Sequence, residues 1–332
     1  MFETTIIRSK MEKLDLTDRK ILSELDKNCR ISSSDLGKKV NKSREAVKYR
    51  IQQLQKNAVI KKFVTSINPG KLGYYIFKVY LKLENIPDER EKFFEELRNR
   101  KDIYWFGISD GAFDAVFIIL SKKITEHYEK INAILSKWKH LVISKVSGMT
   151  IDTRQYNKKF FLSDTDGEFV VFGGNVIDNK VDEVDLNILN ILSNDARIPM
   201  TELAKKVGST IETVRNRIKK LEKKGIILNY RIEVDFNTLG LEFYKAIIYC
   251  RNLSEKDEKT LVEWLRVNPN CIYYIRSLAQ WDIELEFVVE NYQQFNEILN
   301  KLRKDFPAVI RNHEHLIMIY ENWLPAGVLQ SP

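Results

Sequence analysis

The spacing of hydrophobic residues divides the chain into helix-like stretches, with a period of about 3.6 residues, and strand-like stretches, with a period of about two. Helical spacing predicts a first helix over 16–28, a short second helix over about 34–40 and a third over about 43–57. Ser32 or Ser33 is a suitable N-cap for the second helix. A three-residue turn joins the second and third helices, as in a helix-turn-helix.

The chain contains an internal repeat. The segment Arg30–Val40 aligns without a gap with Arg197–Val207, at an offset of 167 residues (197 − 30). The same register places Arg50 on Arg217 and continues into a Leu-Gly pair that follows in both segments. We therefore expect two copies of one unit.

Within each copy, strand-like and helix-like stretches alternate after the helical segment. Between residues 75 and 83, four apolar residues alternate with a second set, which predicts a strand with one buried face (Phe77, Val79, Leu81 and Leu83 against Ile76, Lys78, Tyr80 and Lys82). The predicted order is β-α-β-β-α-β, that of the ferredoxin-like fold. It covers residues 75–83, 88–100, 103–109, 113–120, 125–137 and 142–151, and again 243–250, 255–267, 272–278, 281–289, 292–305 and 309–320.

These patterns predict an α+β protein made of two tandem copies of a winged helix-turn-helix domain followed by a ferredoxin-like βαββαβ sensor domain. A short apolar stretch, Phe169–Phe172, is expected to dock as an edge strand. The predicted boundaries are 1–13 for an N-terminal extension, 14–67 and 181–234 for the winged domains, 68–162 and 235–323 for the sensor domains, 163–180 for a linker and 324–332 for a C-terminal tail.

The third helix of each helix-turn-helix carries the chemistry expected of a DNA-reading helix. In the first copy Val47, Ile51 and Leu54 form its buried face, and the residues opposite are mostly polar or basic. Arginine can pair with guanine, glutamine with adenine, and helix N-termini with phosphate. The candidate DNA-binding residues of these helices and their caps are Lys42, Ser43, Arg44, Lys48, Tyr49 and Gln52, and Ser209, Thr210, Thr213, Arg215, Asn216 and Lys219.

A short basic segment follows each third helix, at Ile60–Ile67 and at Ile226–Val234. Its position predicts a hairpin that forms the wing. Lys61, Lys62 and Arg231 are the candidate phosphate contacts on these wings.

Composition and charge agree with a globular DNA-binding protein. The chain has 332 residues, is 44% hydrophobic and has a net charge of +8. Residues 14–66 carry +7 (13 − 6) and residues 181–232 carry +3 (10 − 7), so much of the excess lies in the helix-turn-helix segments. Three isolated cysteines predict neither a disulfide nor a zinc site. Without an apolar run long enough to span a membrane or a secretory signal, a cytoplasmic protein without membrane contact is expected.

This arrangement resembles the Lrp/AsnC family of feast/famine regulators. The matching stretches are Leu14–Leu22, Asp110–Asp114, Arg197–Val207, and Thr213–Glu222 with Gly225-Ile226. The resemblance implies dimerisation through the sensor domains, assembly into larger rings, and regulation by amino acids bound between sensor domains.

In that family a Gly-x-x-Asp turn helps to form the effector pocket. Gly111-Ala-Phe-Asp114 matches it, with Asp110 beside it, whereas the second copy reads Ala279-Gln-Trp-Asp282 and has lost the glycine. A carboxylate here could pair with an α-amino group. The alternative is that Asp114 and Asp282 only accept backbone hydrogen bonds within a tight hairpin.

Some Lrp-like proteins are siroheme decarboxylases, with His and Arg around the second sensor strand. Here Arg276 is the only candidate in that position, and a possible His313/His315 metal pair lacks a third ligand. No catalytic motif is recognisable. We therefore predict a protein that is not an enzyme and has no cofactor or metal.

The favoured interpretation is a regulator that binds double-stranded DNA sequence-specifically and is modulated by an amino acid or other small effector. A siroheme decarboxylase, and a sensor or assembly module without DNA binding, remain as alternatives. Self-association is expected through the sensor domains, which would pair within one chain as a pseudo-dimer, between chains, or both. An intrachain pair would present two non-identical reading heads and favour an asymmetric operator.

Overall fold

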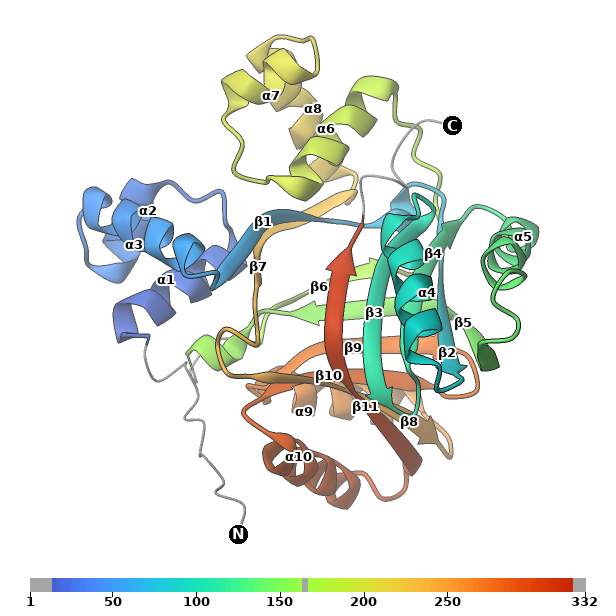
Figure 1. Cartoon of the computed structure of the whole chain (residues 1–332). Coiled ribbons are helices and arrows are strands. Elements are labelled where there is room, and N and C mark those ends of the chain that lie inside the picture. Colours follow the sequence, from blue (N-terminus) through green and yellow to red (C-terminus); the bar gives the residue numbers. More distant parts are fainter. Residues whose placement is uncertain (1–13, 163–166, 325–332) are drawn as a thin grey trace.

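The computed structural model describes residues 14–162 and 167–324. The expected N-terminal extension, part of the linker and nearly all of the C-terminal tail lie outside these residues. Two helical heads project from a two-stranded ribbon, and the ribbon lies against a larger, mostly antiparallel β-structure covered by four helices (Figure 1). None of the described helices is both long and apolar enough to cross a membrane.

Each head consists of three helices, as predicted. Ser32 and Ser43 accept hydrogen bonds from backbone amides at the starts of the second and third helices of the first head, so both are N-caps. Asp182 and Asp185 form a capping box at the start of the second head. The helices are α1 (Leu16–Lys27), α2 (Ser33–Val40), α3 (Arg44–Lys56), α6 (Glu183–Asn194), α7 (Met200–Lys206) and α8 (Ile211–Lys223).

The ribbon replaces the two wings that the sequence predicts. Each basic segment forms one strand, β1 (Ile60–Ile67) or β7 (Ile227–Val234), and the two strands pair antiparallel with each other. The prediction of a hairpin in each copy is therefore wrong. A single strand has no partner within its own copy, and pairing between copies satisfies its backbone groups.

The β-α-β-β-α-β order is present in both copies. Its strands are β2 (Tyr75–Leu83), β3 (Ile103–Gly111), β4 (Ala115–Ser121) and β5 (Val142–Tyr156), then β8 (Glu242–Cys250), β9 (Cys271–Leu278), β10 (Ile283–Val289) and β11 (Ile310–Trp323). Its helices are α4 (Pro87–Asn99), α5 (Ile124–Leu135), α9 (Glu255–Val267) and α10 (Tyr292–Asp305). Two short 3₁₀ turns, η2 (Pro69–Lys71) and η3 (Lys159–Phe161), complete the described elements.

These eight strands form one closed ring. Strand β11 pairs with β8 through its first half and with β3 through its second half, while β5 pairs with β2 and then with β9 in the same way. The two α/β domains thus pair with each other inside one chain, which confirms the expected intrachain pairing. A ninth strand, β6 (Phe169–Gly173), adds to β5 as the predicted edge strand.

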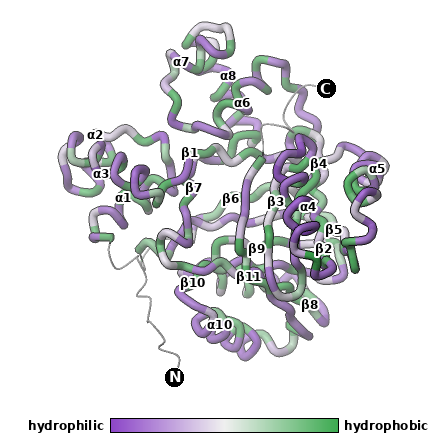
Figure 2. The backbone as a smooth tube through the Cα atoms, in the orientation of Figure 1, coloured by the Kyte–Doolittle hydropathy of each residue, from purple (hydrophilic) through white to green (hydrophobic). Residues whose placement is uncertain are grey.

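Ring closure buries both faces of several strands, among them β2, β4 and β10. On β2, Val79 and Leu81 point outward and pack under α4 and α5, while Ile76 and Tyr80 point into the ring. Figure 2 shows the corresponding apolar segments along the strands of the barrel. The prediction of a single buried face on this strand is therefore wrong, and even Lys78 is only 6% exposed. The expectation of one buried face assumed an open sheet with water on the other side.

Candidate nucleic-acid interface

The two third helices present their polar faces to solvent. In and before α3 the exposed candidates are Lys42, Ser43, Arg44, Lys48, Tyr49 and Gln52, and in and before α8 they are Thr210, Thr213, Arg215, Asn216 and Lys219, with Ser209 half-buried. Opposite them, Val47, Ile51 and Leu54 are buried against the first head, and Val214, Ile218 and Leu221 against the second. The hydroxyls of Ser43 and Thr210 accept hydrogen bonds from the backbone amides of Ala46 and Thr213, so both residues also act as N-caps.

In each head, an arginine of the third helix forms salt bridges with two aspartates at the start of the first helix. Arg50 donates to Asp15 and Asp18 at 2.7 and 2.8 Å. The equivalent Arg217 donates to Asp182 and Asp185 at 2.7 and 2.9 Å. The sequence repeat shows that the two arginines are equivalent, but their carboxylate partners are seen only in the structure. These contacts fix the orientation in which the outward side chains of α3 and α8 are presented.

A reciprocal pair of hydrogen bonds joins the two heads directly. Arg30 donates to the carbonyl oxygen of Ala196 at 2.6 Å, and Arg197 donates to the carbonyl oxygen of Cys29 at 2.9 Å. Each guanidinium also lies over an aromatic ring of the opposite copy, Tyr230 and Phe63. The arginine that begins the repeated motif therefore clamps each copy to the other.

The candidate phosphate contacts of the ribbon differ in how far their side chains are exposed to solvent. Lys62 is exposed, and Lys61 is exposed with its Nζ 3.6 Å from a carboxylate oxygen of Asp235. Arg231 is only 2% exposed and faces inward. Since a buried side chain cannot reach a phosphate, we remove Arg231 from the predicted contacts. The β7 strand turns this residue toward the barrel.

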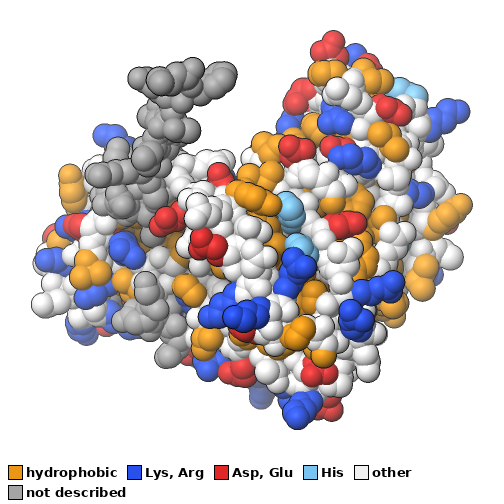
Figure 3. Space-filling model, turned by 90° about the horizontal axis from the view of Figure 1, so that it is seen from below, with side chains coloured by type: hydrophobic (Ala, Val, Ile, Leu, Met, Phe, Trp, Pro, Cys, Tyr) orange, Lys and Arg blue, Asp and Glu red, His pale blue; other side chains and the backbone are white. Residues whose placement is uncertain are grey.

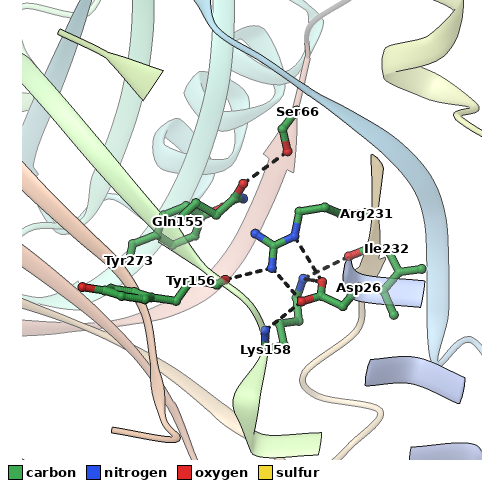
Figure 4. A network of polar contacts seen from close by, with 8 residues as sticks. All are labelled: Asp26, Ser66, Gln155, Tyr156, Lys158, Arg231, Ile232 and Tyr273. Carbon is green, nitrogen blue, oxygen red and sulfur yellow. Dashed lines mark hydrogen bonds and ion pairs between the residues drawn. The ribbon is translucent and has the colours of Figure 1, made fainter. Parts of the chain in front are cut away.

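Arg231 belongs to a buried network that ties the first head to the ribbon and the barrel (Figure 4). Its Nη2 donates to Asp26 at 2.7 Å and to the carbonyl oxygen of Tyr156 at 2.8 Å. The ammonium of Lys158 also donates to Asp26, at 2.7 Å. Burial alone would raise the pKa of Asp26, but Arg231 and Lys158 lower it to about 2. The carboxylate is thus held ionised in the interior.

The predicted effector turns carry carboxylates that already have partners. Asp114 is 5% exposed, and its Oδ2 accepts the amide of Leu83 at 2.8 Å. At the equivalent place, Asp282 accepts the amide of Cys250 at 2.7 Å. Both carboxylates accept a backbone amide, as the structural alternative has it, but the amides belong to the ends of β2 and β8 and not to the hairpins themselves. Asp114 also accepts a hydrogen bond from Lys82. Asp110, four residues before Asp114, is exposed.

Gly111 is required by the packing of its turn. Its φ is +113°, and an added Cβ would lie 2.7 Å from the carbonyl oxygen of His315 on β11. The glycine of the matching motif therefore lets the second copy approach closely.

The interior of the barrel holds a chain of charged side chains that the sequence reasoning missed. Lys78 and Lys245 occupy equivalent positions in the two copies, and both donate to Glu284, at 2.7 and 3.0 Å. Lys245 also lies 2.7 Å from Glu286. Burial alone would raise the pKa of Glu284, but the two lysines hold it well below its ordinary value. Burial lowers the pKa of Lys78.

The residues that suggested enzyme or metal chemistry have structural partners. Arg276 is bonded to Asp152 and to Glu258 on the barrel exterior. His313 and His315 lie side by side on β11 with ring centroids 6.5 Å apart. No group of three potential metal ligands occurs among the described residues.

On the underside of the molecule, basic and acidic side chains are interspersed (Figure 3).

Two capped third helices with exposed polar faces define a protein of the helix-turn-helix class. The family models agree, because an AsnC-type helix-turn-helix domain matches residues 14–55 and a winged helix-turn-helix DNA-binding domain matches residues 181–227. An uncharacterised HTH-type transcriptional regulator of Pyrococcus furiosus is 31% identical over 154 residues, covering 45% of this chain and 97% of that protein. LrpC of Bacillus subtilis is 30% identical over 122 residues, covering 37% of this chain and 83% of LrpC.

The chain belongs to the Lrp/AsnC family of transcriptional regulators. Each of these relatives is about as long as one copy of the repeat. Among solved structures, the siroheme decarboxylase NirDL matches 94% of this chain and 96% of its own, with a TM-score of 0.63 and 10% identity. At that identity the match shows that the two proteins share their overall fold.

Proposed function

We propose that the chain binds double-stranded DNA sequence-specifically through α3 and α8 and acts as a single-chain regulator with two different reading heads. The observation that carries this proposal is the pair of exposed polar helix faces, each fixed by an equivalent arginine bridge. The faces differ, since α3 offers Tyr49 and Gln52 where α8 offers Asn216 and Lys219. Two different faces in one chain favour an asymmetric operator.

The test is fluorescence anisotropy with a duplex from the chain's own promoter and a random duplex, at about 50 mM salt and above. We expect tighter binding to the promoter and a steep loss of affinity with salt. Reversing Arg44 and Lys48 to glutamate should impair one half of the footprint, and reversing Arg215 and Lys219 the other half.

A matched control reverses Lys139 and Lys256, two exposed lysines away from both heads, so that net charge changes equally. This control should bind nearly as well as the unaltered chain, because its lysines lie outside the proposed interface. If both head variants bind like the control, the chain is a sensor or assembly module instead. A strictly palindromic site bound only by pairs of chains would contradict the asymmetric operator.

We also propose that a small effector modulates DNA binding and that the protein acts in the cytoplasm. Binding of an amino acid at Asp110, Gly111, Asp114 or Asp282 stays a prediction, since Asp114 and Asp282 are already hydrogen-bonded. Association of whole chains into larger assemblies also stays a prediction. Light scattering with and without added amino acids tests both.

Decarboxylation of a tetrapyrrole is the second candidate function, favoured by the match of nearly the whole chain to NirDL. Against it, a cavity that lies between the β1–β7 ribbon and the mouth of the barrel is lined by residues such as Tyr104, Arg231 and Tyr273 and by no histidine. Incubation of the protein with siroheme, followed by mass spectrometry, decides the matter. Loss of carbon dioxide from the substrate would establish the enzyme, and an unchanged mass would leave the regulator.

A further inference from the structure

A cavity lies between the β1–β7 ribbon and the mouth of the barrel. Its volume is about 120 Å³, and it is partly open to solvent. The ribbon supplies Val64–Ile67 and Arg231–Val234, and the barrel supplies residues from β3, β5, β9 and β11. A cavity of this size can hold a small aromatic molecule.

Aromatic side chains from distant parts of the chain line much of the cavity. Tyr104, Phe172, Phe236, Tyr273 and Trp323 all contribute to its wall. Their large flat surfaces suit an apolar, planar ligand. No single copy builds this wall, because Tyr104 belongs to the first copy and Tyr273 and Trp323 to the second.

One buried donor on this wall has no partner. The Nε and Nη2 atoms of Arg231 are held by Asp26 and by the carbonyl of Tyr156, whereas Nη1 is buried without a hydrogen-bond acceptor. Figure 4 shows this third nitrogen pointing toward Gln155. Leaving a buried donor unpaired is costly, and a guanidinium N–H pairs best with a carboxylate. Asp26 keeps the guanidinium in place before any ligand arrives.

We propose that this cavity binds a small organic molecule with a flat apolar body and a carboxylate that accepts a hydrogen bond from Nη1 of Arg231. The site lies away from the Gly111 turn and from the outward faces of α3 and α8. Its ligand would contact the two strands that carry the two heads.

A second polar group in the cavity is compatible with an anionic ligand. Glu321 receives a hydrogen bond from the indole nitrogen of Trp105 at 3.2 Å. Burial, together with the carboxylates of Glu286 and Glu233, raises the pKa of Glu321 to about 7. A carboxyl group that is partly protonated at neutral pH repels a bound carboxylate less than an ionised one.

The direct test uses isothermal titration calorimetry of the full chain without DNA, with 2-naphthoate as the probe and 2-naphthamide as its neutral counterpart. We expect one naphthoate per chain and at least about tenfold tighter binding of naphthoate than of naphthamide, because a charge-assisted hydrogen bond is made only with the carboxylate. Arg231→Lys retains a cation beside Asp26 but lacks Nη1, so it should abolish this preference.

Two tryptophan substitutions test the location. Val64→Trp on β1 fills the cavity and should remove binding of both probes, while leaving Arg231 and Asp26 unchanged. Lys139→Trp adds the same side chain at an exposed position outside the cavity wall and away from both heads, and binding should persist. Equal affinities for the two probes, or unaltered binding to Val64→Trp, would overturn the proposal.

The effect of this ligand on DNA binding rests on the proposed function and is measured separately. Anisotropy of the promoter duplex with and without naphthoate should change in the unaltered chain and in Lys139→Trp, but not in Val64→Trp. Calorimetric binding without any DNA binding would refute the proposed function and leave the cavity site standing. DNA binding without calorimetric binding would do the reverse.

Discussion

Replacing Glu284 by glutamine should leave a buried lysine inside the barrel without its carboxylate partner. The side chain of Glu284 is 1% exposed and is the carboxylate partner of Lys78, whereas Lys245 has a second partner in Glu286 at 2.7 Å. Glutamine has nearly the same volume, so the packing changes little. The substitution therefore leaves Lys78 as the buried ammonium without a carboxylate.

The expected cost follows from the two ways in which Lys78 can respond. Keeping a buried charge without its partner costs about 3–5 kcal/mol. Losing the proton instead costs about 4–5 kcal/mol at pH 7, because an ordinary lysine pKa lies about three units above neutrality. Both routes predict a loss of about 3–5 kcal/mol, which is a large part of the roughly 5–15 kcal/mol that stabilises a typical protein.

The assay is urea unfolding followed by circular dichroism at several pH values. If Lys78 is neutral in the folded variant, the unfolded chain binds more protons, and the stability of Glu284→Gln rises with pH up to about pH 10. Glu286→Gln is the matched control, two residues along the same strand, and should cost less because Lys245 keeps Glu284. Adding Lys78→Met to Glu284→Gln should recover much of the loss. Equal losses in the two glutamine variants, or no recovery, would refute this reasoning.

Three further predictions concern the ribbon and the cavity. Arg30→Met with Arg197→Met removes both cross-copy bonds and should speed amide exchange in the β1–β7 ribbon; unchanged exchange would show that the clamp is dispensable. Because folded Glu321 holds its proton to about pH 7, the unaltered protein should lose about 1–3 kcal/mol of stability between about pH 5 and pH 7.5, and Glu321→Gln should not. With a folded pKa of about 2, Asp26 contributes stability that is complete above about pH 4 and lost toward pH 2. Asp26→Asn should show a shallower acid loss in urea unfolding, and a loss as steep as in the unaltered chain would argue against the network.

Local features of the fold were predictable because they depend on neighbouring residues. Helical spacing and capping serines locate the helices of the first head to within a residue or two. The β-α-β-β-α-β order follows from alternation within single segments. The exposed faces of α3 and α8 follow from the same periodicity, and the structure presents most of their predicted residues to solvent.

Contacts between the copies were harder to predict, since they join residues more than a hundred positions apart. A basic strand has the same sequence pattern whether it forms a wing hairpin or pairs with the equivalent strand of the other copy. The pattern therefore did not predict the ribbon, and it led to the prediction that Arg231 is exposed. Lys78 was expected to be exposed, because a lysine on one side of a strand is typical of an open sheet with one face in water. One signal was available: β10 carries Glu284 and Glu286 where β4 has Val116 and Ile118, an unusual gain of charge on a strand.

The contacts between the copies are symmetric at the ribbon and asymmetric in the barrel, and this difference has a physical reason. The Arg30 and Arg197 clamps are equivalent because each head must meet the same antiparallel ribbon. In the barrel, equivalent lysines face each other, and a symmetric set of carboxylates is not needed to neutralise them. Both carboxylates come from β10 and so lie in one copy. Separate identical chains would carry all four carboxylates or none, so this interior requires two copies that differ in sequence. Joining the copies in one chain pairs them reliably, and the same freedom to differ permits two different reading helices.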